Sequence, residues 1–371
     1  MKILSIALDK KILDENSPSF KRQKEYAGLV AKYHVVVFGP EREIKDGHLF
    51  VSGSGGKNKR ASLAKGYKKA RRILAEEPGS WLVTTQDPFF TALLGWRLKK
   101  KFGVKLQIQL HTDFLSPYFR QESCYNRMLY LLGKFLIKKA DGVRVVSQRA
   151  EESLIRQLGI NKNKITVVPV YPDILTQGPK LKTQNRDSNR GTGNRFVFLT
   201  VGRLVRVKNI SLQLEALAEL AKKRPQAELW IVGAGPLEQE LKAETLRLKI
   251  DSQVKFWGWQ TNLEKFYQQA DVFLLTSNYE GWPLVVAEAL SCGLPMIVTD
   301  MGSAGELIKN EVNGLITPVG EKAALVRSME RLVADSKLRQ WLGESAQETA
   351  RSLPTKEQIL AVYKKSWEQA A

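Results

Sequence analysis

The stretch DVFLLTSNYEGWPLVVAEALSCGLPMIVTD, residues 271–300, predicts a strand, a turn, a helix and a second strand. Its first residues, 271–277, form a short apolar run, as a strand covered on both faces should. Pro283 suits the first position of a helix, because its φ angle is already close to a helical value and no donor is lost there. Gly293 is a natural end for that helix, two residues before Pro295. Strand–helix–strand units of this kind are typical of parallel sheets.

The same alternation of strand and helix runs through most of the chain. Short apolar strands are predicted within residues 2–8, 34–39, 80–85, 105–111, 141–147 and 165–170, and then within 195–202, 227–233, 253–258, 271–277, 295–300 and 314–318. Helical periods lie between them, as in 209–223 and 235–249. This pattern predicts an α/β protein with two doubly wound parallel sheets, whose ligands bind at the carboxyl ends of the strands.

The length of 371 residues favours two domains rather than one. Residues 174–194 lack a hydrophobic period and are rich in Gly, Asn, Thr and Gln, which is typical of a linker. We therefore expect an N-terminal Rossmann-like domain over 1–173 and a C-terminal one over 195–354, with substrates in the cleft between them. Residues 355–371 are expected to form a final helix, for which a return to the N-terminal domain is one option.

The composition, 43% apolar and 26% charged, is that of a soluble globular protein. No run of 18 apolar residues is present, so we expect no transmembrane helix. The chain start lacks a signal-peptide cleavage site and is expected to be a buried strand. The two cysteines, Cys124 and Cys292, are far apart and suit a reducing cytosol, and the three histidines form no zinc-binding cluster. We therefore expect a cytoplasmic protein.

The net charge of +20 is unevenly distributed. Residues 1–172 hold 32 Lys and Arg against 15 Asp and Glu, a net charge of +17, whereas residues 195–371 hold 22 against 21, a net charge of +1. A uniformly basic protein would favour nucleic acid as a partner. One basic half favours one half that lies on an anionic partner.

Two glutamates, Glu280 and Glu288, lie eight residues apart around the predicted helix start. The N–H groups of residues 283–286 lie at that start and form an anion site that fits a diphosphate. Glu288 could accept hydrogen bonds from two ribose hydroxyls, since a carboxylate has two acceptor oxygens, and Glu280 could orient another polyol. A plainer interpretation makes Glu280 a helix-dipole residue and Glu288 a solvated position.

A second loop follows the strand predicted at 195–202. Arg203 and Lys208 lie in it, and a guanidinium and an ammonium are the two cationic groups that bind phosphate. A solvated pair of loop cations is the alternative. Gly233 and Gly235 follow the next strand, where glycines let the backbone approach a ligand closely.

Together these motifs resemble the donor domain of retaining glycosyltransferases of the GT-B fold, family 4. The sequences that carry the resemblance are Gly202-Arg203 with Lys208-Asn209, VGAGPL (232–237), NYEGWPLVVAEALSCGLPMIVTD (278–300) with its glutamate pair, and NGLITP (313–318). The likeness covers residues 196–318 strongly and most of 80–172 more weakly. It implies two Rossmann-like domains with doubly wound parallel sheets that face a central cleft.

The resemblance also implies roles for single residues. Arg203, Lys208, Glu280 and His111 would be the catalytic residues. The histidine that corresponds to His111 lines the donor-sugar site in this family, although a histidine after a strand is usually just a polar strand end. The residues that would bind the donor are Gly202, Gly233, Gly235, Gly281, Trp282, Leu284, Val285 and Glu288.

Two departures from the family pattern concern loops. The Gly-Gly turn that often follows the first strand, and lets a loop approach the diphosphate, is replaced by ENSPSFKRQKEY (15–26). The usual IPNGVD before the linker stands here as VVPVYPDI (167–174). The role of the N-terminal loop and the linker-side contacts therefore stay open. Contacts to the base are expected from the backbone near Trp257 to Gln260.

The resemblance implies a retaining, metal-independent hexosyltransferase that uses a nucleotide-sugar donor, UDP-linked before GDP-linked, and no cofactor. Its acceptor would be a glycan or lipid-linked glycan of cell-envelope polysaccharide or glycolipid synthesis. The departing diphosphate oxygen would help to deprotonate the acceptor hydroxyl on the same face of the sugar. The chain has no Asp-x-Asp triplet, which metal-dependent glycosyltransferases of the other main fold normally use, so no bound metal is expected.

The basic half has its densest charge in residues 57–77, which place eight cations among apolar residues. Residues 95–103 and 125–140 add further cations and aromatic residues. A basic amphipathic face of this kind can lie on anionic lipid, which would put the protein at the inner face of the plasma membrane. A solvated helix is the alternative. Rival functions are a nucleic-acid-binding protein on a Rossmann-like frame, and a GT-B epimerase or phosphorylase.

Overall fold

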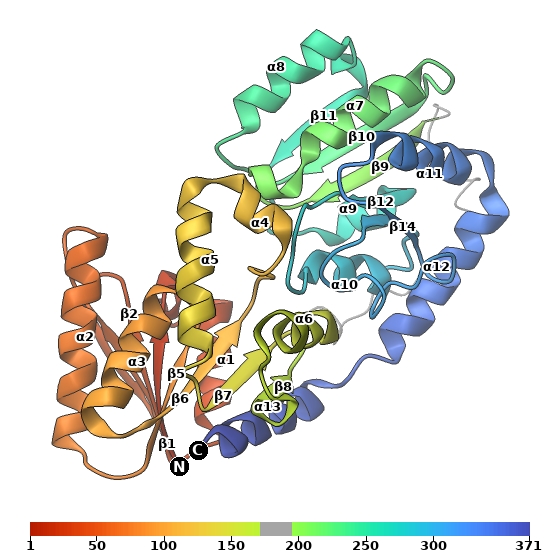
Figure 1. Cartoon of the computed structure of the whole chain (residues 1–371). Coiled ribbons are helices and arrows are strands. Elements are labelled where there is room, and N and C mark those ends of the chain that lie inside the picture. Colours follow the sequence, from red (N-terminus) through yellow and green to blue (C-terminus); the bar gives the residue numbers. More distant parts are fainter. Residues whose placement is uncertain (171–194) are drawn as a thin grey trace. The chain divides into compact units, whose positions relative to one another are not determined.

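A computed structural model describes residues 1–170 and 195–371 of the chain (Figure 1). These residues form two compact units, one made of Met1–Pro169 with Thr355–Ala371 and the other spanning Val170–Pro354. The linker predicted over 174–194 lies outside the described residues. Within the two described ranges, no helix has the length and hydrophobicity that a membrane span requires.

The first unit contains an eight-stranded sheet with the order β3-β4-β2-β1-β5-β6-β7-β8. Its strands are β1 (Lys2–Ala7), β2 (Lys32–Val37), β3 (Glu43–Asp46), β4 (Leu49–Gly53), β5 (Trp81–Thr85), β6 (Lys105–Leu110), β7 (Gly142–Val145) and β8 (Ile165–Val167). All neighbours pair in parallel except β3, which is antiparallel to β4. The six strands predicted before residue 174 are confirmed, and the β3–β4 hairpin was not predicted.

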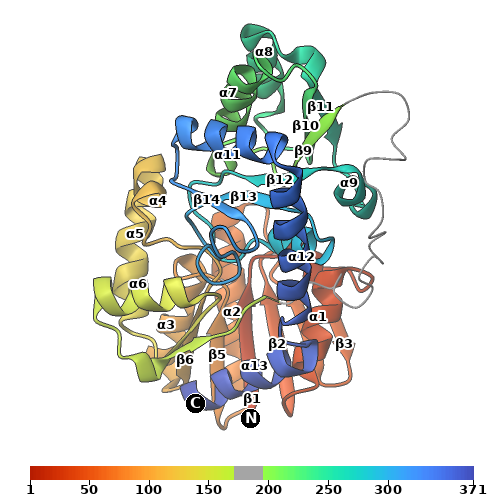
Figure 2. The same cartoon turned by 90° about the vertical axis from the view of Figure 1, so that its right-hand side faces the viewer.

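Seven α-helices and two short 3-10 helices surround this sheet in the described part of the first unit. They are η1 (Lys10–Leu13), α1 (Pro18–Ala27), α2 (Lys59–Glu76), α3 (Phe90–Phe102), α4 (Pro117–Glu122), α5 (Cys124–Ile137), α6 (Gln148–Leu158), η2 (Lys162–Lys164) and α13 (Lys356–Ala370). Helix α3 contacts both α2 and α5, so the three helices lie in series (Figures 1 and 2). Most of the stretch 15–26, which we interpreted as a loop, is helix α1, begun by Ser17 as its N-cap.

The final helix, α13, is part of the first unit. Trp367 is fully buried there, and Gln107 Nε2 on β6 donates to the Ser366 carbonyl oxygen over 2.8 Å. The ring of Tyr363 stacks on that of Tyr26 from α1, with centroids 4.2 Å apart. The chain termini consequently lie side by side in both views (Figures 1 and 2). Helix α13 therefore returns to the N-terminal domain, the option that sequence left open.

The second unit contains a six-stranded sheet, entirely parallel, with the order β11-β10-β9-β12-β13-β14. Its strands are β9 (Phe196–Val201), β10 (Ala227–Val232), β11 (Val254–Gly258), β12 (Val272–Leu275), β13 (Met296–Thr299) and β14 (Leu315–Thr317). Its helices are η4 (Arg206–Lys208), α7 (Ile210–Ala221), α8 (Glu238–Leu248), η5 (Asp251–Gln253), α9 (Glu264–Gln269), α10 (Leu284–Ser291), α11 (Lys322–Ala334) and α12 (Ser336–Arg351). All six strands predicted after residue 194 are confirmed.

Successive residues of β10 show why this sheet is covered on both faces. Leu229 and Ile231 belong to one buried apolar cluster, and Trp230 and Val232 belong to another. Because side chains alternate between the faces of a strand, each face has its own core. The loops that follow the strands are consequently left at the carboxyl edge of the sheet, where ligands of such folds bind.

Candidate functional site

Helix α10 begins at this edge, just after β12. Pro283 is its N-cap residue, with φ −73° and ψ 109°, and no side chain caps the first turn. The helix therefore starts at Leu284, one residue later than predicted, and ends at Ser291, before the left-handed Gly293. Since the first N–H groups of a helix have no acceptor within it, this uncapped start is suited to an anion.

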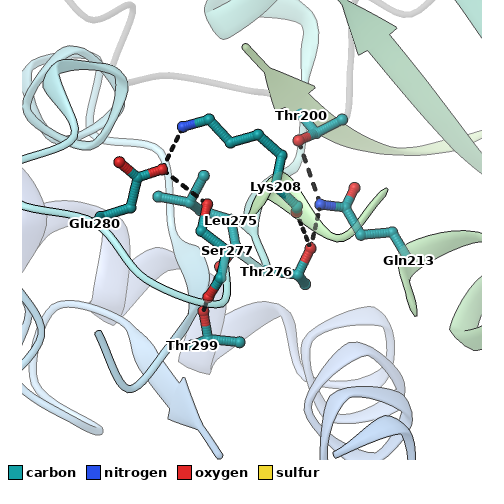
Figure 3. A network of polar contacts seen from close by, with 8 residues as sticks. All are labelled: Thr200, Lys208, Gln213, Leu275, Thr276, Ser277, Glu280 and Thr299. Carbon is teal, nitrogen blue, oxygen red and sulfur yellow. Dashed lines mark hydrogen bonds and ion pairs between the residues drawn. The ribbon is translucent and has the colours of Figure 1, made fainter. Parts of the chain in front are cut away.

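An ion pair joins the loop after β9 to the loop that leads from β12 into α10 (Figure 3). Lys208 Nζ binds the carboxylate of Glu280, and the two side chains are only 17% and 18% exposed. Ser277 Oγ donates to the same carboxylate over 2.9 Å. The loop after β9 thus holds the loop after β12, and the Lys208 ammonium lies in an ion pair with the loop that leads into α10.

A second set of hydrogen bonds fixes the backbone beneath this ion pair (Figure 3). Thr276 Oγ1 lies 3.1 Å from the carbonyl oxygen of Lys208 and accepts from Gln213 Nε2 over 2.8 Å. Thr299 Oγ1 donates to the carbonyl oxygen of Ser277 over 2.6 Å. These buried and part-buried contacts join the loop after β9, helix α7, the loop after β12 and the end of β13, so the position of the Lys208 backbone is set by the fold.

Arg203 lies at the same strand end but is not part of this network. Its side chain is exposed and has no ion pair or hydrogen bond with any residue in 1–170 or 195–371. The structure therefore brings Lys208 and Glu280 together and leaves the Arg203 guanidinium available to a ligand.

The glycines of the two loops have a packing role. A Cβ atom on Gly233, whose φ is +140°, would collide with the carbonyl oxygen of Gly202, and one on Gly235 would collide with that of Leu204. The loops after β9 and β10 therefore approach each other backbone to backbone. A direct contact of Gly202, Gly233 or Gly235 with a donor stays a prediction.

Glu288 is half-buried on α10 and accepts a hydrogen bond from Tyr267 Oη over 2.7 Å. Burial raises the pKa of Glu288, while the hydrogen bond from Tyr267 opposes the rise. The pKa of Tyr267 is raised well above its usual value, mainly by burial and then by the charge of Glu288. Glu288 is thus not the solvated position of the alternative interpretation: one oxygen is held by Tyr267.

The remaining predicted donor-binding residues surround the start of α10. Gly281 is buried, and Trp282, Leu284 and Val285 are half-buried. Trp282 and Val285 pack against the apolar cluster under the sheet, so their side chains have a structural role. This leaves the backbone of the first turn as the part of α10 best suited to bind a ligand.

His111 belongs to the first unit and follows β6. Its Nε2 lies 3.2 Å from Gln109 Oε1 in a partly buried contact, and burial, with the nearby charge of Arg144, lowers the pKa of His111 to about 3. The same oxygen accepts from Arg144 Nη1 over 2.9 Å, and Gln109 Nε2 donates to Tyr363 Oη over 2.9 Å. Since Gln109 Oε1 is an acceptor, His111 Nε2 is the donor, which leaves Nδ1 to accept from a ligand.

Several site residues were not found from the sequence. Ser277 and Tyr267 hold the two glutamates, and Gly302, with φ +53°, packs against the backbone of Glu280 and Gly281. Ser277 could have been found as a polar residue at a strand end. Among the described residues, no group of three or more His, Cys, Asp or Glu side chains could hold a metal ion.

Comparison with known proteins matches one glycosyltransferase family model to each part of the chain. The family model Glycosyltransferase Family 4 matches residues 26–170, and the model Glycosyl transferases group 1 matches residues 182–349. An uncharacterized glycosyltransferase of Methanocaldococcus jannaschii is 33% identical over 62% of this chain and 58% of its own length. The UDP-Gal:alpha-D-GlcNAc-diphosphoundecaprenol alpha-1,3-galactosyltransferase of Escherichia coli is 30% identical over 51% of this chain and 50% of its own. The chain thus spans only 48% to 58% of the first three curated relatives.

Among solved structures, Anabaena HepE in complex with UDP-glucose aligns with 99% of this chain and 98% of its own, with a TM-score of 0.72 and 22% identity. Such a likeness shows the fold. With one family model on each unit and the GT-B fold throughout, the chain belongs to the family 4 glycosyltransferases.

Proposed function

We propose that this protein is a retaining hexosyltransferase that moves a sugar from a nucleotide-diphospho-sugar to a glycan or lipid-linked acceptor of cell-envelope synthesis. The observation that carries the proposal is the pairing of an uncapped α10 start with the Lys208 ammonium at the same strand ends. A diphosphate needs both a row of N–H donors and positive charge. The exposed Arg203 guanidinium supplies a second cation.

The donor is proposed to be UDP-linked, with GDP as the second choice. Support comes from Anabaena HepE, which was solved with UDP and with UDP-glucose, and from the Escherichia coli enzyme, whose name contains UDP-Gal. The same name contains diphosphoundecaprenol, which supports a lipid-linked acceptor here. We place the reaction in the cytoplasm, at the inner face of the plasma membrane.

In the proposed reaction, the bond between the anomeric carbon and the diphosphate oxygen breaks. The acceptor oxygen bonds to that carbon on the same face, and its proton passes to the departing diphosphate. The protein therefore has to stabilise the charge that builds up on the diphosphate, which is the task of Lys208, Arg203 and the first N–H groups of α10. Glu280 keeps Lys208 in place, and His111 would contact the sugar through Nδ1.

UDP release from a panel of UDP-sugars and GDP-sugars, with and without an undecaprenyl-diphosphate glycan, tests this function. We expect release of the nucleotide diphosphate with one donor of the panel, and only when the acceptor is present. Salt-sensitive binding to plain DNA with no nucleotide-sugar binding would instead favour the nucleic-acid-binding alternative. Conversion of the sugar without transfer would favour an epimerase, and phosphate-dependent cleavage would favour a phosphorylase.

Removal of divalent metal should leave the transfer rate unchanged. The reason is that Arg203, Lys208 and the α10 N–H groups would stabilise the charge on the diphosphate, so that the protein takes the role that a metal ion has elsewhere. The measurement is UDP release in buffer with excess EDTA. A loss of activity that added Mg²⁺ or Mn²⁺ restores would show that the site depends on a metal.

Replacement of Glu288 by alanine should raise the donor KM by roughly 10–100-fold, because a hydrogen bond to a charged group contributes about 1.5–3 kcal/mol. Tyr267→Phe is the matched control: it removes the bond between the two side chains but keeps the carboxylate. We expect that control to retain a donor KM close to the wild-type value. If Glu288→Ala leaves the donor KM unchanged, the carboxylate serves only to satisfy Tyr267.

A further inference from the structure

Helix α5 presents an apolar stripe to the solvent. Tyr125, Met128, Leu131 and Phe135 are 48%, 48%, 66% and 46% exposed. Their spacing of three, three and four residues puts them on one face of the helix. The opposite side of α5 is already buried in the first unit, through residues such as Leu136. The four exposed side chains therefore do not belong to the core of the first unit. Contiguous exposed apolar patches of this kind mark interaction sites.

Aromatic and cationic side chains extend this stripe onto α3 and α2. The ring of Trp96 on α3 packs edge-on against Phe135, with centroids 5.4 Å apart. Lys100 lies over Trp96 at 4.7 Å, and Lys139 lies over Phe135 at 5.2 Å. At the other end of the stripe, Lys59 of α2 lies within 6.0 Å of the Tyr125 ring centre.

The charge around the stripe is mainly positive, although Lys99 of α3 pairs with Asp141 over 2.6 Å and the exposed Glu122 lies just before α5. Neither α3 nor α5 contains an aspartate or a glutamate, whereas α3 has four lysines or arginines, and Lys138 and Lys139 directly follow α5. Helix α2, which packs beside α3 (Figure 1), has seven cations and one acid. The partner must therefore offer both negative charge and an apolar interior.

We infer that Trp96, Tyr125, Met128, Leu131 and Phe135, with the lysines around them, dock on a membrane that contains anionic lipid; we call these residues the α5 surface. The large apolar side chains would enter the boundary between head groups and acyl chains, and the lysines would bind the head groups. A second copy of the chain would bring like charges together. A nucleic acid would engage the cations but not Met128 or Leu131.

This inference stands on the surface of the first unit and does not depend on the donor site of the second. Docking would bring the protein to an acceptor held in the membrane, as proposed above. The two proposals fail separately, because UDP release with a water-soluble acceptor does not require vesicles, and vesicle binding does not require a nucleotide-sugar.

Vesicle flotation of the full chain tests the inference, with phosphatidylcholine vesicles compared with vesicles that also contain phosphatidylglycerol. We expect binding to the anionic vesicles only, weakened by added salt as charge screening increases. Leu131→Gln combined with Phe135→Gln should lower the partition coefficient by about tenfold or more, since both side chains lose their apolar insertion. The matched control is Leu246→Gln with Trp341→Gln, a pair that is 64% and 57% exposed on the second unit. This control should bind like the wild type.

Three outcomes would overturn the inference. One is a wild-type chain that stays unbound with phosphatidylglycerol vesicles. The second is a Leu131 and Phe135 double variant that partitions like the wild type. The third is a double variant that still binds vesicles but no longer binds a second copy of the chain or duplex DNA. That result would assign the α5 surface to a protein or a nucleic-acid partner. Melting temperatures of both double variants should match the wild type, because all four substitutions are at exposed positions.

Discussion

Replacement of Lys208 or of Arg203 by alanine is expected to lower the turnover of sugar transfer by about 10²–10³, or roughly 2.7–4 kcal/mol of transition-state stabilisation. Each cation would face the diphosphate as its negative charge grows. The Lys208 ammonium is already positioned by Glu280 and by the loops beneath it, so its attraction requires little reorganisation.

The two substitutions differ in their structural cost. Lys208→Ala leaves the half-buried carboxylate of Glu280 without its cation, so some stability should be lost with activity. Arg203→Ala removes an exposed side chain with no partner in the described residues, so its melting temperature should stay at the wild-type value. The Arg203 variant therefore separates catalysis from folding.

Arg206→Ala is the matched control, because Arg206 is an exposed cation in the same loop. Steady-state rates of UDP release at saturating donor compare the three variants with the wild type. We expect the control to lose little activity. Turnover within a few-fold of wild type for both Arg203→Ala and Lys208→Ala would remove these cations from the reaction.

Replacement of Trp367 by alanine should destabilise the first unit by about 3–5 kcal/mol, the range measured for large aromatic residues in cores. Trp367 is fully buried, and its ring centre lies 4.8 Å from that of Tyr363 and 5.6 Å from that of Tyr33. The substitution would leave a cavity between α13 and the sheet, so the C-terminal helix would lose its main anchor.

Urea unfolding measures this loss, with the transition of the first unit followed separately, since two domains need not unfold together. Trp341→Ala on α12 is the control: Trp341 is 57% exposed, and its loss should change stability by only about 0.5 kcal/mol or less. A Trp367 variant as stable as the control would mean that α13 does not hold the first unit together.

The strands of both sheets could be predicted because each is a short apolar run between turns. The β3–β4 hairpin was missed because β3 is polar and lies at the sheet edge, where burial sets no pattern. Gly47 was its signal: Asp46 pairs with Leu49, so Gly47 and His48 form a two-residue turn, and a glycine with φ +58° at the first turn position is typical of a hairpin. The position of α13 could not be predicted, because the pattern of an amphipathic helix does not show which surface of the protein the helix covers.

The candidate site was predictable in part. Glu280, Lys208 and the start of α10 follow β12 and β9, which are adjacent in the sheet. Because the carboxyl ends of parallel strands lie at one edge of a sheet, these residues are expected to lie close together. The bond between Tyr267 and Glu288 joins residues 21 positions apart with no shared period, and only the packing of α9 creates it. Gly233 and Gly235 were interpreted as ligand contacts, whereas the structure gives them a steric reason that sequence does not reveal.

A crystal structure of the chain with UDP bound tests the central claim most directly. The account predicts that the diphosphate lies at the start of α10, with its oxygens within hydrogen-bond distance of Leu284 or Val285 N–H, of Lys208 Nζ and of the Arg203 guanidinium. A diphosphate bound elsewhere, with both cations pointing into solvent, would contradict it.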